Sequence, residues 1–152
     1  MEDGGYEGVR TYIASGNVLF ETDRPAKELE DHIEELLEAR FKVALVVAVR
    51  SERQLRAVVA KAPKGFGTEP TKYHSDAVFL KGPLTAAKAM GVVDLKEGVD
   101  DAWPGTGVIY FRRLSAKRTA SRMGRIVGTP EYKLMTIRSW QTVMKLLALL
   151  DE

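Results

Sequence analysis

Two short runs near the start of the chain are rich in β-branched and aromatic residues. They are Val9–Ala14 and Val18–Glu21, and Ser15, Gly16 and Asn17 separate them. Runs of this kind are typical of half-buried strands. The Gly-Asn pair supplies the positive φ angles that a two-residue hairpin turn requires. The pattern therefore predicts a β-hairpin.

The following segments change from helical spacing to a continuous apolar run. After Pro25, apolar residues recur every three or four positions and acids lie between them, which predicts an amphipathic helix. Val43–Val49 is almost wholly apolar and predicts a central strand that is buried on both faces. Ser51 then caps a further helix, which ends at Pro63.

The pattern restarts after a stretch rich in glycine and proline. Residues 63–75 hold Gly65, Gly67 and Pro70, and they are interpreted as a linker. From residue 76 the predicted order is strand, helix, strand, strand, helix, strand, followed by a terminal helix. The second helix of this series is predicted from Ser115 to about Val127. This order is that of the split βαβ, or ferredoxin-like, unit.

The predicted fold class is α+β, with tandem ferredoxin-like (βαββαβ) halves and a C-terminal helix. Residues 1–62 form an incomplete half (ββαβ plus a connecting helix) that lacks its initial strand and helix, and residues 76–152 form a complete one. Ferredoxin-like strands lie in the order four, one, three, two, so the absent strand belongs beside Val43–Val49. We therefore expect an N-terminally shortened form of a longer protein. Otherwise we expect a gap that closes by direct strand pairing, or through a homodimer that pairs the exposed strand edges of the first half.

Charge is distributed unevenly along the chain. Residues 112–145 hold nine basic residues and one acid, giving +8, whereas the remainder holds 14 basic and 20 acidic residues, giving −6. A charge segregated in this way attracts polyanions or pairs one part of a protein with another. The basic segment is expected to form one positive patch.

The composition excludes several classes of protein. The chain has no cysteine, so it has no disulfide, no thiolate metal site and no cysteine nucleophile. The longest apolar run, Val43–Val49, is far too short to span a membrane, and residues 1–5 are acidic and glycine-rich, unlike a signal peptide. We therefore expect a cytoplasmic protein without membrane contact.

The hairpin turn is the most specific local signal. Its backbone amides, with the side chains of Ser15 and Asn17 and the small Gly16, are predicted to form a polar lip for an anionic or amide ligand. The plainer interpretation is a turn and nothing more.

The predicted basic helix is the second signal. Arg118, Arg122 and Arg125 fall at helical spacing next to Lys117, and arginine forks bind phosphate in bidentate fashion. Arg138 and Trp140 flank the cap of the last helix: Arg138 is predicted to bind the ligand together with the hairpin and the basic helix, and the tryptophan is predicted to be a buried anchor. The plainer interpretation of the basic helix is a solvated outer face.

Several segments resemble the signature of a known bacterial family. They are Arg10–Phe20, Leu114–Arg122, Val127–Pro130 and Met135–Val143. Together they resemble the family named domain of unknown function 1697, and the match covers nearly the whole chain. The resemblance implies a pair of ferredoxin-like halves and no known biochemical activity. This chain departs from the family at Ser139, where asparagine is usual, and in lacking the family's opening strand and helix with its Arg-Gly-Ile-Asn-type segment. If that segment forms half of the family's site, this chain carries only the other half.

No catalytic or metal-binding constellation is recognised in the sequence. His32 and His74 lack partners at ligand spacing, and adjacent Asp100 and Asp101 point to opposite faces of a strand. We expect no metal, no cofactor and no enzymatic activity, and we predict a domain that binds a small anionic ligand through the hairpin turn and the basic helix.

Two alternative functions stay open. One is an RNA-binding protein, although the aromatic Gly-Phe strand motif of RNA-recognition modules is absent. The other is an enzyme that acts on an anionic metabolite through arginine and backbone electrostatics.

Overall fold

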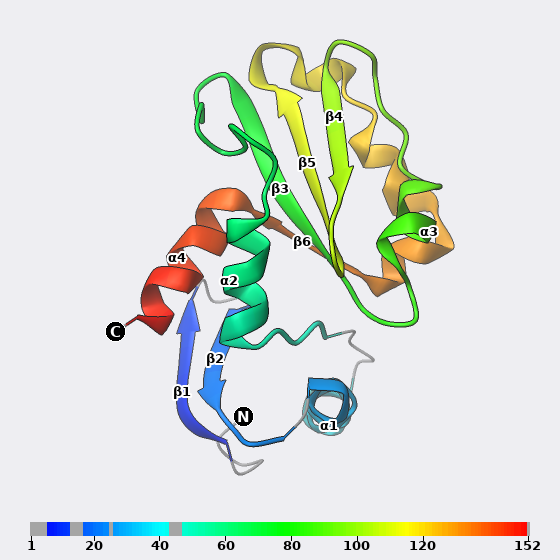
Figure 1. Ribbon diagram of the computed structural model, residues 1–152. Coiled ribbons are helices and arrows are strands. Elements are labelled where there is room, and N and C mark those ends of the chain that lie inside the picture. The colour runs from blue at the N-terminus through cyan, green and yellow to red at the C-terminus, as the bar shows by residue number, and fades with distance from the viewer. Residues whose placement is uncertain (1–5, 13–16, 25, 43–46, 152) are drawn as a thin grey trace.

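Two antiparallel sheets and several helices make up the molecule (Figure 1). The computed structural model describes residues 6–12, 17–24, 26–42 and 47–151. One sheet has two strands and the other has four, so the α+β class is confirmed. Among the described residues, no helix has both the length and the apolar character that crossing a membrane requires.

The N-terminal sheet is the predicted hairpin. β1 (Glu7–Tyr12) and β2 (Asn17–Glu21) pair antiparallel, with Tyr12 opposite Asn17. Asn17 therefore opens β2 and is not a turn residue, so the predicted position of the turn is wrong by at least this residue. Ser15 and Gly16 lie outside the described residues.

A small core holds the hairpin against α1 (Ala26–Phe41). Tyr6 of the hairpin and Leu29 and Ile33 of α1 are buried together, and Phe20 packs against them from β2. Leu29 and Ile33 are one helical turn apart, so α1 buries an apolar stripe, and Asp31, Glu35 and Glu38 are exposed on its outer side. This core is much smaller than the two clusters in the rest of the chain.

The predicted strand Val43–Val49 is wrong where the structure describes it. Residues 47–49 belong to neither sheet. The backbone N–H of Val47 donates to Oε2 of Glu34 at 2.7 Å, and that of Val49 donates to Oε2 of Glu30 at 3.0 Å. Glu30 and Glu34 are one turn apart on α1, so their carboxylates reach alternate N–H groups of the segment. Buried amides need partners, and here helix side chains supply them in place of a neighbouring strand.

The four-stranded sheet has the order β4-β5-β3-β6, and every neighbouring pair is antiparallel. Its strands are β3 (Tyr73–Leu80), β4 (Asp100–Pro104), β5 (Val108–Leu114) and β6 (Met135–Ser139). If β3, β4, β5 and β6 are counted as strands one to four, their order in the sheet, read from the β6 edge, is four, one, three, two. The short helix α3 (Ala86–Met90) connects β3 to β4.

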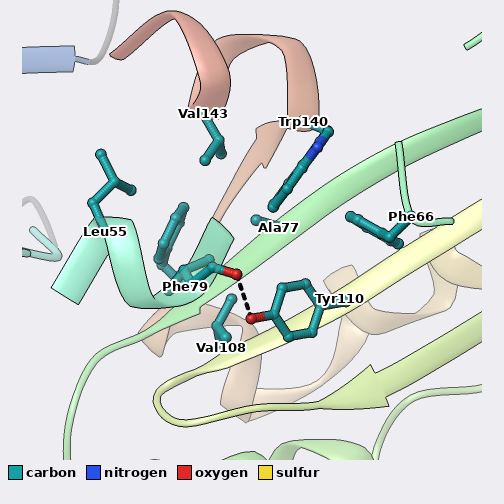
Figure 2. Packing of buried hydrophobic residues seen from close by; sticks show 9 residues of the cluster. Leu55, Phe66, Ala77, Phe79, Val108, Tyr110, Trp140 and Val143 are labelled. Atoms are coloured by element: carbon teal, nitrogen blue, oxygen red, sulfur yellow. Dashed lines mark hydrogen bonds between the residues drawn. The ribbon is translucent and has the colours of Figure 1, made fainter. Parts of the chain in front are cut away.

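Both faces of this sheet are covered. The face toward α2 (Glu52–Ala60) and α4 (Trp140–Leu150) carries a buried cluster made of Leu55, Val58, Phe66, Ala77, Phe79, Val108, Tyr110, Trp140 and Val143 (Figure 2). The opposite face carries Val78, Leu80, Leu84, Ala89, Ile109, Phe111, Met123, Ile126 and Met135. Successive residues of β3 and β5 therefore alternate between two cores. Trp140 is 9% exposed, so its predicted role as a buried anchor is confirmed.

The segment between the predicted halves is packed into the second core. α2, which the sequence analysis groups with the first half, buries Leu55 and Val58 against the four-stranded sheet. Within the predicted linker, Phe66 is buried edge-on against Trp140, and β3 already begins at Tyr73. Residues 52–75 therefore pack with the second half.

The basic helix predicted from Ser115 to about Val127 is wrong. The segment forms two 3₁₀ helices, η2 (Ser115–Ala120) and η3 (Met123–Gly128), and a third, η4 (Pro130–Leu134), follows. Asp100 interrupts the chain between the first two by accepting hydrogen bonds from Oγ of Ser121 at 2.6 Å and the backbone N–H of Arg122 at 2.8 Å. A carboxylate that binds the backbone in this way competes with a continuous helix.

Candidate functional site

Two of the residues predicted for the site meet at the hairpin. Nε of Arg138, in β6, donates a hydrogen bond to Oδ1 of Asn17 at 2.9 Å, although 121 positions separate the two residues. Arg138 also donates from Nη1 to the carbonyl of Ile137 at 2.8 Å. The guanidinium thus ties the hairpin to the edge strand of the larger sheet, a role that needs no ligand.

The remaining predicted basic residues lie apart from this junction. Lys117 and Arg118 are exposed on η2. Arg122 and Arg125 both pair with Asp94, at 3.6 Å and 2.6 Å. Because the 3₁₀ helices replace one α-helix, these side chains do not form the predicted single stripe. Asp94 balances part of their charge, and the arginines lower the pKa of its carboxyl.

A pocket of about 660 Å³ lies between α2 and the turn that joins β4 to β5. α2 contributes Gln54, Ala57 and Val58, its C-cap contributes Lys61, and the end of β4 with the following turn contributes residues 104–107. The pocket is lined by Arg50, Gln54, Ala57, Val58, Lys61, Pro104, Gly105, Thr106, Gly107, Val108 and Tyr110. Its volume falls within the range of small-molecule sites.

Arg50 is fixed at one end of this pocket by backbone carbonyls. Its Nη1 donates to the carbonyl of Val49 at 2.9 Å, and its Nη2 donates to those of Leu80 and Gly107, the latter at 3.0 Å. The guanidinium also lies over the ring of Phe79, with Cζ 5.7 Å from the ring centroid. Three separate parts of the chain, at Val49, at the end of β3 and at Gly107, therefore hold one cation in place.

The charge of Arg50 lacks a direct counter-ion. None of the carboxylates in the described part of the chain makes an ion pair with it. Burial lowers the pKa of Arg50, and the more distant charge of Glu30 offsets only part of this effect. Carbonyl oxygens accept hydrogen bonds from Nη1 and Nη2 but leave the net charge in place, so Arg50 makes this end of the pocket electropositive.

Two other polar groups of the lining are already engaged. The hydroxyl of Tyr110 donates to the carbonyl of Val58 at 2.7 Å, and burial raises its pKa. Gln54 completes a capping box, in which its Oε1 accepts from the backbone N–H of Ser51 at 2.8 Å. Lys61, at the C-terminal end of α2, adds a second cation to the rim.

A buried carboxyl group lies elsewhere, on the opposite face of β3. Asp76 is 7% exposed, and Nε2 of His74 lies 3.1 Å from its Oδ1. Burial raises the pKa of Asp76, while the charges of His74 and Arg113 oppose the shift. No hydroxyl or thiol nucleophile is in hydrogen-bond contact with this pair in the part of the chain that the structure describes, and no group of ligating side chains there could hold a metal ion.

Sequence reasoning missed Arg50 for a physical reason. Arg50 follows an apolar run and precedes a helix cap, which is unremarkable in sequence. Its partners lie 30 and 57 positions away, so the site exists only after the chain has folded.

Comparisons with known proteins agree with this architecture. The family model described as "Protein of unknown function (DUF1697)" matches residues 1–110. Among solved structures, the chain is similar to the conserved bacterial protein SP0830 from Streptococcus pneumoniae, with 20% sequence identity and a TM-score of 0.82 over 99% of this chain and 84% of that one. A search of curated proteins found no match. The family model spans more than half of the chain, which therefore belongs to the DUF1697 family of proteins of unknown function.

Proposed function

We propose that this protein binds a small anionic ligand in the pocket between α2 and the β4–β5 turn. The observation that supports the proposal is the state of Arg50, a largely desolvated cation that lines a pocket without a carboxylate partner among the described residues. A cation removed from water is costly unless an opposite charge approaches it. A bound phosphate or carboxylate would supply that charge.

The surroundings of Arg50 favour an anion further. Lys61 lies on the same rim, and among the described residues neither a carboxylate nor a histidine contributes to the lining. α2 begins two residues after Arg50, and the first turn of a helix carries partial positive charge. The apolar side chains of Val58 and Val108 line the remaining wall and suit the carbon skeleton of a metabolite.

The lining favours binding over catalysis. Nucleophilic catalysis needs a nucleophile beside a base, and general acid–base catalysis needs a group that titrates near neutral pH. In the part of the lining that the structure describes, Thr106 is the sole hydroxyl besides Tyr110, and no histidine or carboxylate there could serve it as a base. An enzyme acting on an anionic metabolite is therefore the weaker alternative.

A thermal-shift screen at constant ionic strength tests the proposal. The panel comprises inorganic phosphate, mononucleotides, sugar phosphates and dicarboxylates. A ligand that binds the folded state alone raises the melting temperature in proportion to its saturation. We expect a selective, saturable shift with one of these classes.

Matched lysine variants locate the binding. Lys61→Ala removes a cation of the rim and should weaken binding roughly 10-fold, the order expected for a charge-assisted hydrogen bond. Lys64→Ala removes an exposed lysine three positions away that does not line the pocket, and it should leave the affinity unchanged. Equal affinities for both variants would show that the ligand does not bind in this pocket.

We also propose that the chain consists of two ferredoxin-like halves in tandem, the first incomplete, and that the protein is cytoplasmic. The strand order of the larger sheet supports a ferredoxin-like second half, and the hairpin with α1 supports an incomplete first half in tandem with it. The absence of cysteine supports a cytoplasmic protein. Pairing of two copies through strand edges of the first half is a further proposal, which size-exclusion chromatography with light scattering would test.

A further inference from the structure

Three side chains gather on the four-stranded sheet beyond its buried core. Directly opposite residues of an antiparallel pair project to the same face. Trp103 lies opposite Tyr110, and Arg112 lies opposite Ser75, so both project to the face that carries the core of α2 and α4. Tyr73, two residues before Ser75, projects there too. We call Tyr73, Trp103 and Arg112 the aromatic patch.

Arg112 joins the two rings of the patch. Its Cζ lies 4.0 Å from the ring centroid of Tyr73 and 5.2 Å from that of Trp103. Its Nε donates to Oδ2 of Asp101 at 3.1 Å, which fixes the plane of the guanidinium. Contacts between a guanidinium and an aromatic ring are favourable, so the two rings are held in position before any ligand arrives.

Solvent reaches the aromatic patch. The three side chains are only partly buried, whereas Ala77 and Tyr110 beside them lie in the core. Figure 1 shows α2 and α4 beside β6, away from the upper end of β5 that carries Arg112, whereas Trp103 lies one residue before the lower end of β4. On the inner side, Trp103 meets the edge of Phe66, with ring centroids 6.0 Å apart.

One further cation contacts the patch, and two more are exposed on the neighbouring η2. Nζ of Lys72 lies 5.2 Å from the ring centroid of Tyr73. The carbonyl of Lys72 accepts a hydrogen bond from the backbone N–H of Ser115 at 2.9 Å, which ties the start of η2 to this corner of the sheet. η2 carries the exposed Lys117 and Arg118.

We propose that the aromatic patch binds single-stranded nucleic acid. Bases stack on Tyr73 and Trp103, because every base offers a π face and stacking tolerates any sequence. Lys72, Lys117 and Arg118 contact the phosphates that connect the stacked bases. The combination of flat rings with cations fits this polyanion better than an acidic peptide, which has no rings to stack. The patch borders the Arg50 pocket, because Trp103 lies opposite Tyr110 of the pocket lining, but Tyr73, Trp103 and Arg112 do not line the pocket. Separate variants therefore test the two proposals.

Fluorescence anisotropy with labelled rU10 and dT10 at low salt tests the proposal on the intact chain. Tyr73→Leu and Trp103→Leu keep apolar side chains on the strands but remove the rings, and each should weaken binding roughly 10-fold or more. Tyr73→Phe keeps the ring and should bind like the wild type. The control Tyr132→Leu removes a tyrosine that is 36% exposed on η4 and should leave the affinity unchanged. Circular dichroism confirms that each variant is folded.

Each result decides the question. Ring-dependent binding that weakens as salt rises supports the proposal. Absence of oligonucleotide binding overturns it, and so does equal binding by the wild type, Tyr73→Leu and Trp103→Leu. Displacement of rU10 by poly-glutamate at similar concentration also overturns it, in favour of an acidic protein partner. Lys61→Ala should bind the oligonucleotides normally, which separates failure here from failure of the pocket proposal.

Discussion

Substituting Gly67 by alanine tests whether the aromatic core fixes the chain between α2 and β3. Gly67 has φ +77°, and a Cβ added there would lie 2.2 Å from Cδ1 and 2.5 Å from Nε1 of Trp140. The indole cannot move aside freely, because it packs edge-on against Phe66 with ring centroids 4.9 Å apart. It also packs against Tyr110, at 6.2 Å. Alanine at this position must therefore displace the core.

Gly65 provides a matched control for the magnitude. It has φ +81°, but a Cβ added there would meet nothing closer than Oγ1 of Thr68 at 3.9 Å. Gly65→Ala should thus cost only the left-handed backbone conformation, about 1–2 kcal/mol in the free energy of unfolding. Gly67→Ala carries the same cost plus overpacking of about 1–3 kcal/mol, giving about 2–5 kcal/mol.

Urea unfolding, followed by far-ultraviolet circular dichroism and tryptophan fluorescence, measures both variants. We expect Gly67→Ala to lower the free energy of unfolding by at least about 1 kcal/mol more than Gly65→Ala does. Equal losses in the free energy of unfolding would show that the Trp140 side chain moves aside for the new methyl group without an energetic cost. The description of a tightly packed aromatic core at this point would then be wrong.

Three further predictions concern burial and charge. Trp140→Ala should lower the free energy of unfolding by about 3–5 kcal/mol in urea titrations, because it removes the largest side chain of the buried cluster drawn in Figure 2. A loss below about 1 kcal/mol would contradict this prediction. The raised pKa of Asp76 means that the folded state binds the proton of this carboxyl group more tightly than the unfolded state does. Protonation of Asp76 therefore stabilises the fold fully below pH 3.8, its ordinary pKa, and this contribution is lost as pH rises through the pKa of the folded state. Asp76→Asn should therefore gain stability relative to the wild type as pH rises above about 4, and a constant difference across pH would refute the assignment. Glu34→Ala should speed hydrogen exchange of the Val47 amide, measured by NMR, whereas unchanged exchange would show that the carboxylate does not protect it.

The sequence predicts elements best where the pattern is local. The pairing of the hairpin strands, the amphipathic helix α1 and the burial of Trp140 follow from periodicity, turn residues and a capped helix start. These features depend on neighbours within a few positions, and the structure retains them. The position of Asn17 is harder to predict, because the strand register sets it: Asn17 is the first residue of β2 and pairs with Tyr12 of β1.

The sequence fails where a distant polar group intervenes. Asp100 binds the backbone at Arg122 and so divides the predicted basic helix, and Glu30 and Glu34 supply partners to the amides of Val47 and Val49. Neither interaction produces a periodic pattern in the sequence. The candidate site shows the same limit, because Arg50 becomes notable only when its distant carbonyl partners surround it.

The central claim is that an anion binds at Arg50. NMR of the Arg50 side chain tests this claim most directly. The arginine Nε–H signals are recorded while inorganic phosphate and then pyrophosphate are added at constant ionic strength, and Arg50→Lys assigns the signal. We predict that the Arg50 signal and the backbone amides of residues 105–107 shift together and saturate at one ligand per chain. Shifts confined to Arg118 and Lys117, or no saturable shift at Arg50, would contradict the account.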